Sequence, residues 1–373
     1  MKIAIFGGSF NPVHNEHIKV VKGAINELNL DKLIVMPTFI SPHKQNAEFI
    51  SCEHRLNMLK LAFQGEKRVE VSSYEIDKGG VSYTYQTVEH IKNLYKNAEI
   101  YFMLGSDMLE NFPTWKNPEI ILKNATLLLT ERRNGEFDDD ALIDKIYKTL
   151  GARVKKLNVY GEDISSTKIR VYSKLGLSLD GLVPSSVNDY IVSNSVYKTD
   201  KYYEYIKNAL PEKRRVHTAG VIILAITLAK QLGVDVNKAE LSALLHDVAK
   251  YKDINDYKDC ILPNDLPSDI IHQFLGEYIA RNQLGVTDED VLSAIKYHTT
   301  GRYEMSTLEK VIYVADLIEP SRKFNGVDAL REEIKKDFNK GFKICLEEIV
   351  EFLKLNGKQV YALTLDALKG ENL

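Results

Sequence analysis

The chain has 373 residues, of which 44% are hydrophobic and 27% charged, and a chain of this length usually forms about two domains. This ordinary composition excludes collagen-like, low-complexity and fully disordered chains. The net charge is −3, so no overall basic field indicates a nucleic acid or an anionic membrane as a partner, and we expect neither.

The first half alternates short apolar strand patterns with helical ones. Helices are predicted at residues 15–28, 52–63 and 84–94. A further helix is predicted between the last two strands, and another at residues 184–193, where a proline stands at a favourable helix-start position. Strands alternating with helices predict a parallel sheet covered on both faces, that is, an α/β domain. The predicted strands are residues 2–6, 32–36, 68–72, 99–104, 126–130 and 156–159.

The second half has helical patterns and almost no strand signal. Apolar residues that recur with a period of 3.6 over such lengths predict an all-α domain. We therefore expect two domains, residues 1–198 and 199–373. The periodic segments of the second half are residues 217–232, 238–249, 270–284, 288–298 and 307–318.

The cysteines indicate the compartment. Cys52, Cys260 and Cys345 are far apart and form no CxxC pair, so neither a disulfide framework nor a thiolate metal site is expected. A reducing cytoplasm fits this usage. The N-terminal apolar run is too short for a signal peptide, and the longest apolar stretch, residues 221–229, is too short to span a bilayer.

Residues 7–17, GGSFNPVHNEH, follow the first strand and open the first helix. In such sheets, ligands bind beyond the carboxyl ends of the strands. Glycines let backbone N–H groups approach a phosphate, and the helix N-terminus adds partial positive charge. His14 and His17 share one face of the helix start, so their rings can donate to phosphate oxygens. The alternative is a structural turn with two surface histidines.

Residues 164–170, ISSTKIR, follow the last strand and start a helix. Alone, Ser165 or Ser166 would be explained as a helix cap. Together with the first motif, this second strand-to-helix junction can hold one triphosphate from the opposite side. Lys44 and Arg170 would then supply positive charge.

With several further segments, these motifs make residues 2–197 resemble the bacterial nicotinate-nucleotide adenylyltransferases, which have a Rossmann-like fold. The paired first and last motifs are typical of the wider nucleotidyltransferase superfamily, and the intervening segments indicate nicotinate mononucleotide as the acceptor. Those segments are PHK at residues 42–44, SYT at 82–84, LGSD at 104–107, and Trp115.

The resemblance implies that the 5′-phosphate of nicotinate mononucleotide attacks the α-phosphate of ATP, with Mg²⁺ accompanying the ATP. Pyrophosphate leaves and no covalent enzyme intermediate forms, so catalysis consists of positioning and charge neutralisation. The residues implied in catalysis are His14, His17, Lys44 and Arg170. Those implied in ATP binding are Gly7, Gly8, Ser9, Phe10, His14, His17, Gly105, Asp107, Ile164, Ser165, Ser166 and Arg170. Those implied in acceptor binding are Lys44, Tyr83, Thr84 and Trp115.

Three points stay open in this half. Trp115 would stack on the pyridine ring, but a lone tryptophan is by default a packing residue. The family usually has glycine between the two histidines where this chain has Glu16, and a carboxylate there would repel a triphosphate unless it points outward. Nicotinamide mononucleotide and phosphopantetheine are alternative acceptors.

The second half carries an ordered series of histidines and aspartates. Apolar neighbours place His246 and Asp247 on a largely apolar helix, and they frame Asp316 in the same way. A buried carboxylate is costly unless it is paired or metal-bound. One histidine alone would be an ordinary core or surface residue, but the set favours a helix-bundle metal site. The full series is His217, His246, Asp247, His272, His298 and Asp316.

Residues 203–328 resemble the HD-domain phosphohydrolases. The segments YHTTG at 297–301 and VIYVADLIEPSR at 311–322 indicate the bacterial branch that hydrolyses diadenosine tetraphosphate symmetrically to two ADP. Two metals are implied, iron being our first expectation and manganese the second, and paired metals activate water and clamp phosphate oxygens. The implied ligands of the first metal are His217, His246, Asp247 and Asp316, and those of the second are His272 and His298, with Asp247 bridging.

Two basic residues near this series are candidates for binding substrate phosphate. Lys250 lies one turn after His246, with an ordinary helix-end lysine as the alternative, and Arg322 is a weaker candidate. The sequence thus predicts a bifunctional enzyme. A helical half that senses nucleotides without turnover is the rival from another class. The oligomeric state is not defined by the sequence, and a homodimer is one arrangement open to it.

Overall fold

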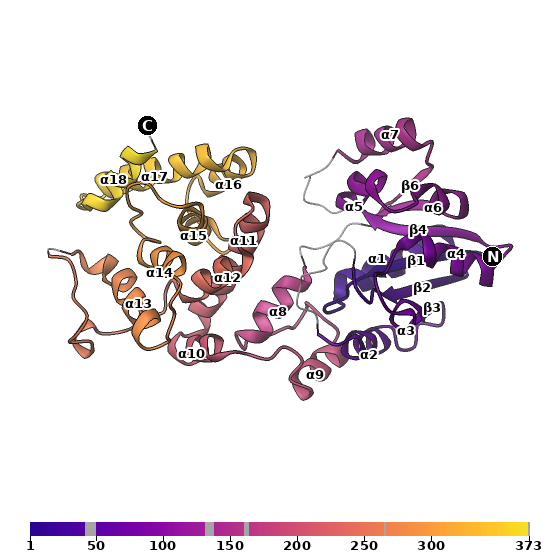
Figure 1. Cartoon of the computed structure of the whole chain (residues 1–373), viewed down its shortest axis with the longest axis horizontal. Helices are drawn as coiled ribbons and strands as arrows, with labels where there is room; N and C mark the ends of the chain where they lie inside the picture. The colour runs from indigo at the N-terminus through magenta and orange to yellow at the C-terminus, as the bar shows by residue number, and fades with distance from the viewer. Residues whose placement is uncertain (42–49, 131–137, 160–163, 265, 372–373) are drawn as a thin grey trace. The chain divides into compact units, whose positions relative to one another are not determined.

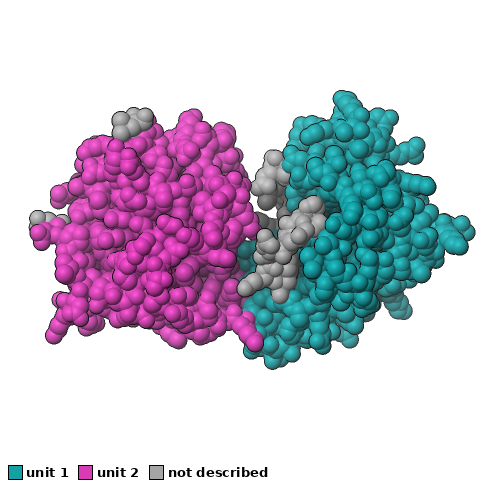
Figure 2. Space-filling view, viewed as in Figure 1, with its two compact units in different colours: residues 1–170, 179–197 teal, residues 171–178, 198–373 magenta. Residues whose placement is uncertain are grey.

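The computed structural model describes residues 1–41, 50–130, 138–159, 164–264 and 266–371 (Figure 1). Contacts divide the chain into two compact units, one of residues 1–170 and 179–197, the other of residues 171–178 and 198–373 (Figure 2). The division falls inside helix α8 (Ser166–Lys174). A boundary between domains at residues 198 and 199 stays a prediction.

The first unit is the predicted α/β fold with a parallel sheet. Within the described residues, six strands lie in the order β3-β2-β1-β4-β5-β6, and all neighbours are parallel. The strands are β1 (Lys2–Gly8), β2 (Lys32–Pro37), β3 (Val69–Val71), β4 (Glu99–Gly105), β5 (Thr126–Thr130) and β6 (Val154–Leu157). The α-helices are α1 (Asn15–Leu28), α2 (Cys52–Ala62), α3 (Tyr74–Lys78), α4 (Thr84–Leu94), α5 (Ser106–Asn111), α6 (Pro118–Asn124), α7 (Asp139–Leu150) and α9 (Ser185–Ser193), with the 3₁₀ turn η1 (Phe112–Thr114).

Helices cover both faces of this sheet. Ile3, Ala4 and Ile5 are all fully buried on β1, although successive strand side chains point to opposite faces. Ile3 and Ile5 pack in one cluster with Val88 of α4 and Ile146 of α7. A central parallel strand buried on both faces explains why the strand segments are continuous apolar runs rather than alternating ones.

The strand order places a topological switch point between β1 and β4. The two strands are hydrogen-bonded neighbours, and the chain continues from β1 to β2 and β3 on one side and from β4 to β5 and β6 on the other. The loops that leave Gly8 and Gly105 therefore run in opposite directions. A crevice forms at such a point, and it is where open α/β sheets bind ligands.

The second unit is helical, as predicted, and no strand occurs in the part of it that the structure describes. Its α-helices are α10 (Lys201–Ala209), α11 (Glu212–Leu232), α12 (Val236–Leu245), α13 (Ile271–Asn282), α14 (Glu289–Lys296), α15 (Thr307–Ile318), α16 (Val327–Lys336), α17 (Phe338–Leu355) and α18 (Ala362–Gly370). Two 3₁₀ turns, η2 (Ile254–Asp256) and η3 (Ser268–Ile270), precede α13.

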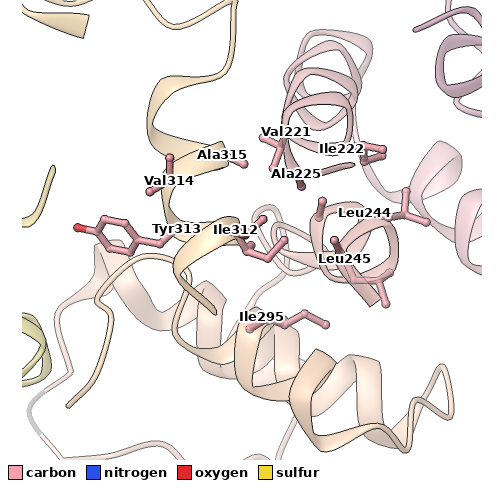
Figure 3. Packing of buried hydrophobic residues seen from close by; sticks show 14 of the residues in the cluster. Val221, Ile222, Ala225, Leu244, Leu245, Ile295, Ile312, Tyr313, Val314 and Ala315 are labelled. Atoms are coloured by element: carbon pink, nitrogen blue, oxygen red, sulfur yellow. The ribbon is translucent and has the colours of Figure 1, made fainter. Parts of the chain in front are cut away.

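The core of this unit lies where α11, α12, α14 and α15 meet (Figure 3). Leu245, Ile312 and Val221 are fully buried there, and each such side chain contributes about 1.5–3 kcal/mol to stability. Leu245 directly precedes His246, and the buried Ala315 directly precedes Asp316. The apolar core therefore fixes the backbone positions of both polar residues.

One helix in the described ranges, α11, is long and apolar enough to cross a membrane by length and composition alone. It extends beyond the apolar stretch at residues 221–229. Half of its most apolar window is buried inside the protein, and the core helix of a soluble protein meets the same criterion. The helix therefore gives only weak evidence of a membrane span.

Two of the predicted helices that end earlier than expected do so beside predicted metal ligands. The helix predicted at residues 238–249 ends at Leu245, and the one predicted at 288–298 ends at Lys296. His246 and His298 thus lie in turns just after their helices and not within them. Their rings contact carbonyl groups of the last helical turn, and such carbonyls have no partner within a helix.

Candidate active sites

The first candidate site lies at the carboxyl end of β1. His14 is the N-terminal cap of α1, and its ring stacks on that of His17 with centroids 3.6 Å apart. The backbone N–H of His14 donates to Nδ1 of His17 (3.2 Å). A neutral imidazole that accepts at Nδ1 carries its proton on Nε2. This contact makes Nε2 of His17 a hydrogen-bond donor, as phosphate binding requires.

The loop before these histidines is tightly folded. Phe10 is buried and has a positive φ of 44°, a backbone conformation that residues other than glycine rarely adopt. A Cβ at Gly8 would lie 3.1 Å from the Phe10 ring, whereas one at Gly7 would meet nothing within 4 Å. The absence of a side chain at Gly8 therefore leaves room for the Phe10 ring, and no other atom crowds the position of a Cβ at Gly7.

The structure brings the two distant motifs together. The hydroxyl of Ser166 donates to the carbonyl of Pro12 (2.9 Å), and Nη1 of Arg170 donates to the carbonyl of Asn11 (2.9 Å). The hydroxyl of Ser165 instead accepts from the backbone N–H of Lys168 and caps α8. The ISSTKIR segment thus braces the first loop. Arg170 makes its described contacts to the protein itself, which adds a structural role to the predicted catalytic one.

A further residue, which the sequence analysis missed, braces the same loop. Arg55 of α2 is buried, with 1% of its surface exposed. Its Nη1 donates to the carbonyl of Ser9 (2.9 Å), and its Nη2 contacts Sγ of Cys52 (3.1 Å). An arginine inside an ordinary amphipathic helix carries no sequence signal for this role, because its partner is a backbone carbonyl 46 residues away.

Three predicted acceptor residues, Tyr83, Thr84 and Trp115, lie at or near the start of α4. Tyr83 caps that helix, which begins at Thr84, and Nζ of Lys116 lies 4.3 Å from the centre of the Tyr83 ring. The neighbouring Trp115 is half-buried and contacts the rings of Phe112 (5.2 Å) and Phe102 (6.1 Å). Trp115 is thus partly a packing residue, and its stacking on a pyridine ring stays a prediction.

A buried carboxyl group organises this region. Glu75 is 6% exposed and accepts a hydrogen bond from the hydroxyl of Thr87 (2.6 Å). Burial raises the pKa of Glu75, although hydrogen bonds from Thr87 and Ser82 oppose the rise. Ser82 in turn accepts from the backbone N–H of Phe39 (2.9 Å). These contacts connect the start of α4 to the chain that follows β2.

The remaining predicted residues of this half have these positions. Gly105 ends β4 at the switch point, and Asp107 is exposed in the first turn of α5. Ile164 is half-buried just before α8, and Glu16 is half-buried in the first turn of α1. Lys44 lies outside the described residues.

The second candidate site centres on Asp247, which is 1% exposed. Its Oδ2 lies 3.2 Å from Nε2 of His246 and 3.8 Å from Nε2 of His217. Its Oδ1 faces a different pair, at 3.5 Å from Nε2 of His272 and 3.9 Å from Nε2 of His298. Each carboxylate oxygen therefore belongs to a different group of potential ligands, which is the geometry of a bridging ligand.

Asp316 joins the first group only. Its Oδ1 lies 3.1 Å from Nε2 of His217 and 4.0 Å from Nε2 of His246. The side chain is 19% exposed, so Asp316 is largely but not fully buried. It lies in the last turn of α15.

Hydrogen bonds on the far side of the rings orient the histidines. Nδ1 of His246 donates to the carbonyl of Ala243 (2.6 Å), and Nδ1 of His298 donates to that of Ile295 (2.8 Å). A ring with its proton on Nδ1 presents the lone pair of Nε2, and such contacts are the usual way in which metal-binding imidazoles are fixed. Both rings therefore turn Nε2 toward Asp247.

Electrostatics favour the metal-binding protonation states of His272, His298 and Asp247. Burial lowers the pKa of His272 to about 4 and that of His298 to about 3, so both rings are neutral near pH 7. Burial by itself would raise the pKa of Asp247, but its interactions with His246 outweigh burial and hold that pKa below the usual range. Neutral imidazoles and ionised carboxylates are the forms that bind cations.

The donor set fits two divalent cations. Nε2 of His217 and Nε2 of His246 are 3.4 Å apart, and Nε2 of His272 and Nε2 of His298 are 3.2 Å apart. Two nitrogens that each lie about 2.1 Å from one ion have a similar separation. Both oxygens of Asp247 are buried; Oδ2 is paired with Arg214 (2.6 Å), and Oδ1 lies 3.5 Å from Nε2 of His272. The two groups that can hold an ion are His217, His246 and Asp247, and Asp247, His272 and His298.

Basic residues surround this cluster. Nζ of Lys250 lies 3.2 Å from Nε2 of His272, and Arg322 forms an ion pair with Asp316 (2.5 Å). Arg214, which the sequence analysis missed, forms an ion pair with Oδ2 of Asp247 (2.6 Å). Its place three residues before His217, on the same helix face, is the signal that would have found it.

A pocket of about 560 Å³ opens beside the cluster. Its lining includes His272, Lys250, Lys252 and Ile254. A substrate that entered it would meet ammonium groups and the second group of ligands together. The full lining is Ala249, Lys250, Lys252, Asp253, Ile254, Ser268, Asp269, Ile271 and His272.

Comparisons with known proteins agree with the two folds. A cytidylyltransferase-like family matches residues 5–171, and the HD domain matches residues 214–321. Fold and sites thus define a protein with a cytidylyltransferase-like part followed by an HD domain.

Relatives of known name match the whole chain and each part. A Mycoplasma genitalium protein named "Probable nicotinate-nucleotide adenylyltransferase/Ap4A hydrolase" is 32% identical over 370 residues, 98% of this chain and 97% of the relative. A Clostridium tetani "Probable nicotinate-nucleotide adenylyltransferase" is 36% identical over 53% of this chain and 99% of its own length. A Halalkalibacterium halodurans "Bis(5'-nucleosyl)-tetraphosphatase, symmetrical" is 42% identical over 44% of this chain and 92% of its own length. The chain belongs to the family of two-part nicotinate-nucleotide adenylyltransferase/Ap4A hydrolases, which confirms both resemblances.

Proposed function

We propose that the chain is a bifunctional enzyme of nucleotide metabolism. Its first unit transfers AMP from ATP to nicotinate mononucleotide and releases pyrophosphate. Its second unit hydrolyses diadenosine tetraphosphate to two ADP. The full-length relative carries both activities in its name, and each part of the chain has a separate relative named for one of them.

The contact between the two motifs at the β1–β4 switch point supports the transferase activity. The 5′-phosphate oxygen of the acceptor forms a bond to the α-phosphorus of ATP, the bond to the β-phosphate oxygen breaks, and pyrophosphate leaves. His17 would donate from Nε2 to a phosphate oxygen, and the stacked His14 would hold its ring in place. Lys44 and Mg²⁺ would neutralise further charge. Such positioned donors provide most of the rate in this type of reaction.

Arg55 and Arg170 would act on the loop rather than on the nucleotide. Both donate to its backbone carbonyls, at Ser9 and Asn11 respectively. These bonds hold the loop in one conformation before ATP arrives, so less conformational entropy is lost on binding.

The proposal for the hydrolase activity rests on Asp247, whose two carboxylate oxygens face two different pairs of histidines. Asp247 would bridge two divalent cations, with His217, His246 and Asp316 completing one site and His272 and His298 the other. The cations would supply an activated water and neutralise phosphate oxygens. Hydrolysis would join a water oxygen to one of the two central phosphorus atoms and break the bond of that atom to the central bridging oxygen, so that two ADP form. We propose iron, with manganese as the alternative, because mixed imidazole and carboxylate ligands suit both.

Lys250 and Arg322 would hold the polyphosphate. Lys250 lies both beside His272 and in the wall of the pocket. A substrate phosphate could therefore contact its ammonium group while the rest of the nucleotide occupies the pocket. Arg322 contacts Asp316 on the other side of the cluster, where it would neutralise charge near the first metal.

Steady-state kinetics with three acceptors test the transferase assignment. We expect the purified full-length chain to have its highest kcat/KM with nicotinate mononucleotide, and much lower values with nicotinamide mononucleotide and phosphopantetheine. A higher value with either alternative would contradict the assignment.

Metal analysis and product analysis test the hydrolase assignment. We expect two transition-metal ions per chain and ADP as the nucleotide product of diadenosine tetraphosphate. Binding of the dinucleotide without turnover by a metal-loaded chain would instead support a nucleotide-sensing helical unit.

We further propose that the enzyme works in the cytoplasm on small nucleotides, without a nucleic-acid or membrane partner. The three cysteines are unpaired in the structure, which suits a reducing compartment. Light scattering of the purified chain would determine whether it forms a homodimer.

A further inference from the structure

Glu319 is a buried carboxylate next to the metal-binding cluster. Its side chain is 1% exposed, and its Oε1 accepts a hydrogen bond from Nδ1 of His217 (3.0 Å). The opposite nitrogen of the same ring, Nε2, faces Asp316 and Asp247. Glu319 therefore contacts the first ligand group through the back of one imidazole and not directly.

The carboxylate is held firmly in this position. Oε2 accepts from the backbone N–H of Ser321 (2.7 Å), and Oε1 accepts from the Ser321 hydroxyl. Arg331 fixes the backbone around it by donating to the carbonyl of Ile318 (2.9 Å) and to that of Glu319 itself (2.8 Å). The ring of His217 thus meets a fixed acceptor in a fixed direction.

Gly220 provides the space for this carboxylate. It lies on α11, one turn after His217. A Cβ at this position would be 2.3 Å from Oε2 of Glu319, a distance shorter than any real contact of a Cβ. The φ of Gly220 is not among the positive glycine φ values of this chain, so close approach, rather than backbone conformation, requires a glycine here.

Two of the other histidines, His246 and His298, are supported in a different way. His246 and His298 donate from Nδ1 to neutral backbone carbonyls, whereas His217 donates to a carboxylate. A carboxylate partner makes an imidazole a more basic ligand and fixes its orientation more strongly. The first ligand group also includes Asp316 in addition to the shared Asp247, so it offers one more carboxylate ligand.

We propose that Glu319 is a positioning residue for the metal ligand His217, admitted by Gly220, and that it makes the site of His217, His246 and Asp316 the tighter of two metal sites. The inference rests on the proposal that the cluster holds two divalent cations. It concerns metal affinity and not turnover, so it can fail or hold independently of the hydrolase activity.

The test is a calorimetric titration of the metal-free full-length chain with Mn²⁺. We expect two binding steps for the wild-type protein. Glu319→Gln keeps the size of the side chain and removes its charge, and it should weaken the tighter step about 10- to 100-fold while leaving the weaker step unchanged. Gly220→Ala should weaken the same step, because its methyl group displaces the carboxylate without altering any ligand.

Glu309→Gln is the matched control. Glu309 lies in the first turn of α15, the helix that ends just before Glu319. It is also 1% exposed, and it pairs with Arg302 rather than with a histidine. This variant should bind both ions as the wild type does, even if it unfolds at a lower temperature.

Three results would overturn the proposal. They are unchanged titration of a folded Glu319→Gln variant, weakening of the looser step instead, and a wild-type chain that binds fewer than two ions. By contrast, two tight ions without hydrolysis of diadenosine tetraphosphate would refute the proposed hydrolase function and leave the positioning role intact.

Discussion

Replacing Asp247 with asparagine should remove at least one metal ion and abolish hydrolysis, yet leave adenylyl transfer intact. The substitution keeps the size of the side chain and removes its charge. Because Oδ2 faces His217 and His246 while Oδ1 faces His272 and His298, both ligand groups lose a charged member at once. The two cations would then repel one another with less compensation between them.

The expected loss is large. Two unit charges 4 Å apart attract by about 4 kcal/mol at an effective dielectric constant of 20, and a divalent ion doubles this figure. Even the smaller value corresponds to roughly 10³-fold weaker binding. Asp247 also loses its ion pair with Arg214 (2.6 Å). Removing one partner of a buried pair costs about 3–5 kcal/mol, and the partial exposure of Arg214 favours the lower end of that range.

The assay compares metal content with both activities in one full-length preparation. Asp247→Asn and the wild type are loaded with metal, dialysed, and measured by mass spectrometry, while circular dichroism checks folding. Asp366→Asn serves as the control, since Asp366 is 43% exposed and pairs only with the exposed Lys369 in the described part of the chain. Two ions per chain with normal hydrolysis would refute the bridging role. Loss of both activities in a folded variant would refute the independence of the two units.

Three further predictions concern single side chains. His17→Ala should lower adenylyl transfer by about 10²-fold or more, because one positioned donor is worth about 2.7–4 kcal/mol in such reactions; a folded variant with near-normal transfer would contradict its phosphate-binding role. Trp115→Ala should raise the KM for nicotinate mononucleotide by the loss of roughly 1–3 kcal/mol of stacking without changing the KM for ATP, whereas equal impairment of both would show that the packing against Phe112 has collapsed. Lys250→Met should reduce kcat/KM for diadenosine tetraphosphate about tenfold or more, since a hydrogen bond to a charged group is worth about 1.5–3 kcal/mol. Unchanged hydrolysis with unchanged metal content would remove Lys250 from the substrate site.

The fold was largely predictable because its segments are locally consistent. The helices at Asn15–Leu28, Thr84–Leu94 and Thr307–Ile318 match the predicted bounds, since each has an apolar face of the right period and a clear start. The last strand was placed two residues too late: it is Val154–Leu157 and not 156–159. Short helices such as α3 and α5 were missed, because five or six residues are too few to establish a period.

The sequence predicted which residues form the candidate metal site but not how their side chains are arranged. Sequence order and residue type pointed to the histidines and aspartates. They did not show that His246 and His298 lie just after their helices, where each ring contacts the carbonyl group three residues earlier. Glu319 was not predicted either, since it lies 102 residues from its partner His217.

The central claim is that one polypeptide carries two separate nucleotide activities. The most direct test is a chromatographic product profile of the purified chain, supplied with ATP, Mg²⁺, nicotinate mononucleotide and diadenosine tetraphosphate after loading with iron or manganese. The account predicts deamido-NAD and pyrophosphate from the first unit, and ADP as the nucleotide product of the dinucleotide. Formation of ATP and AMP from the dinucleotide, or the absence of either product set from an active, metal-loaded preparation, would contradict it.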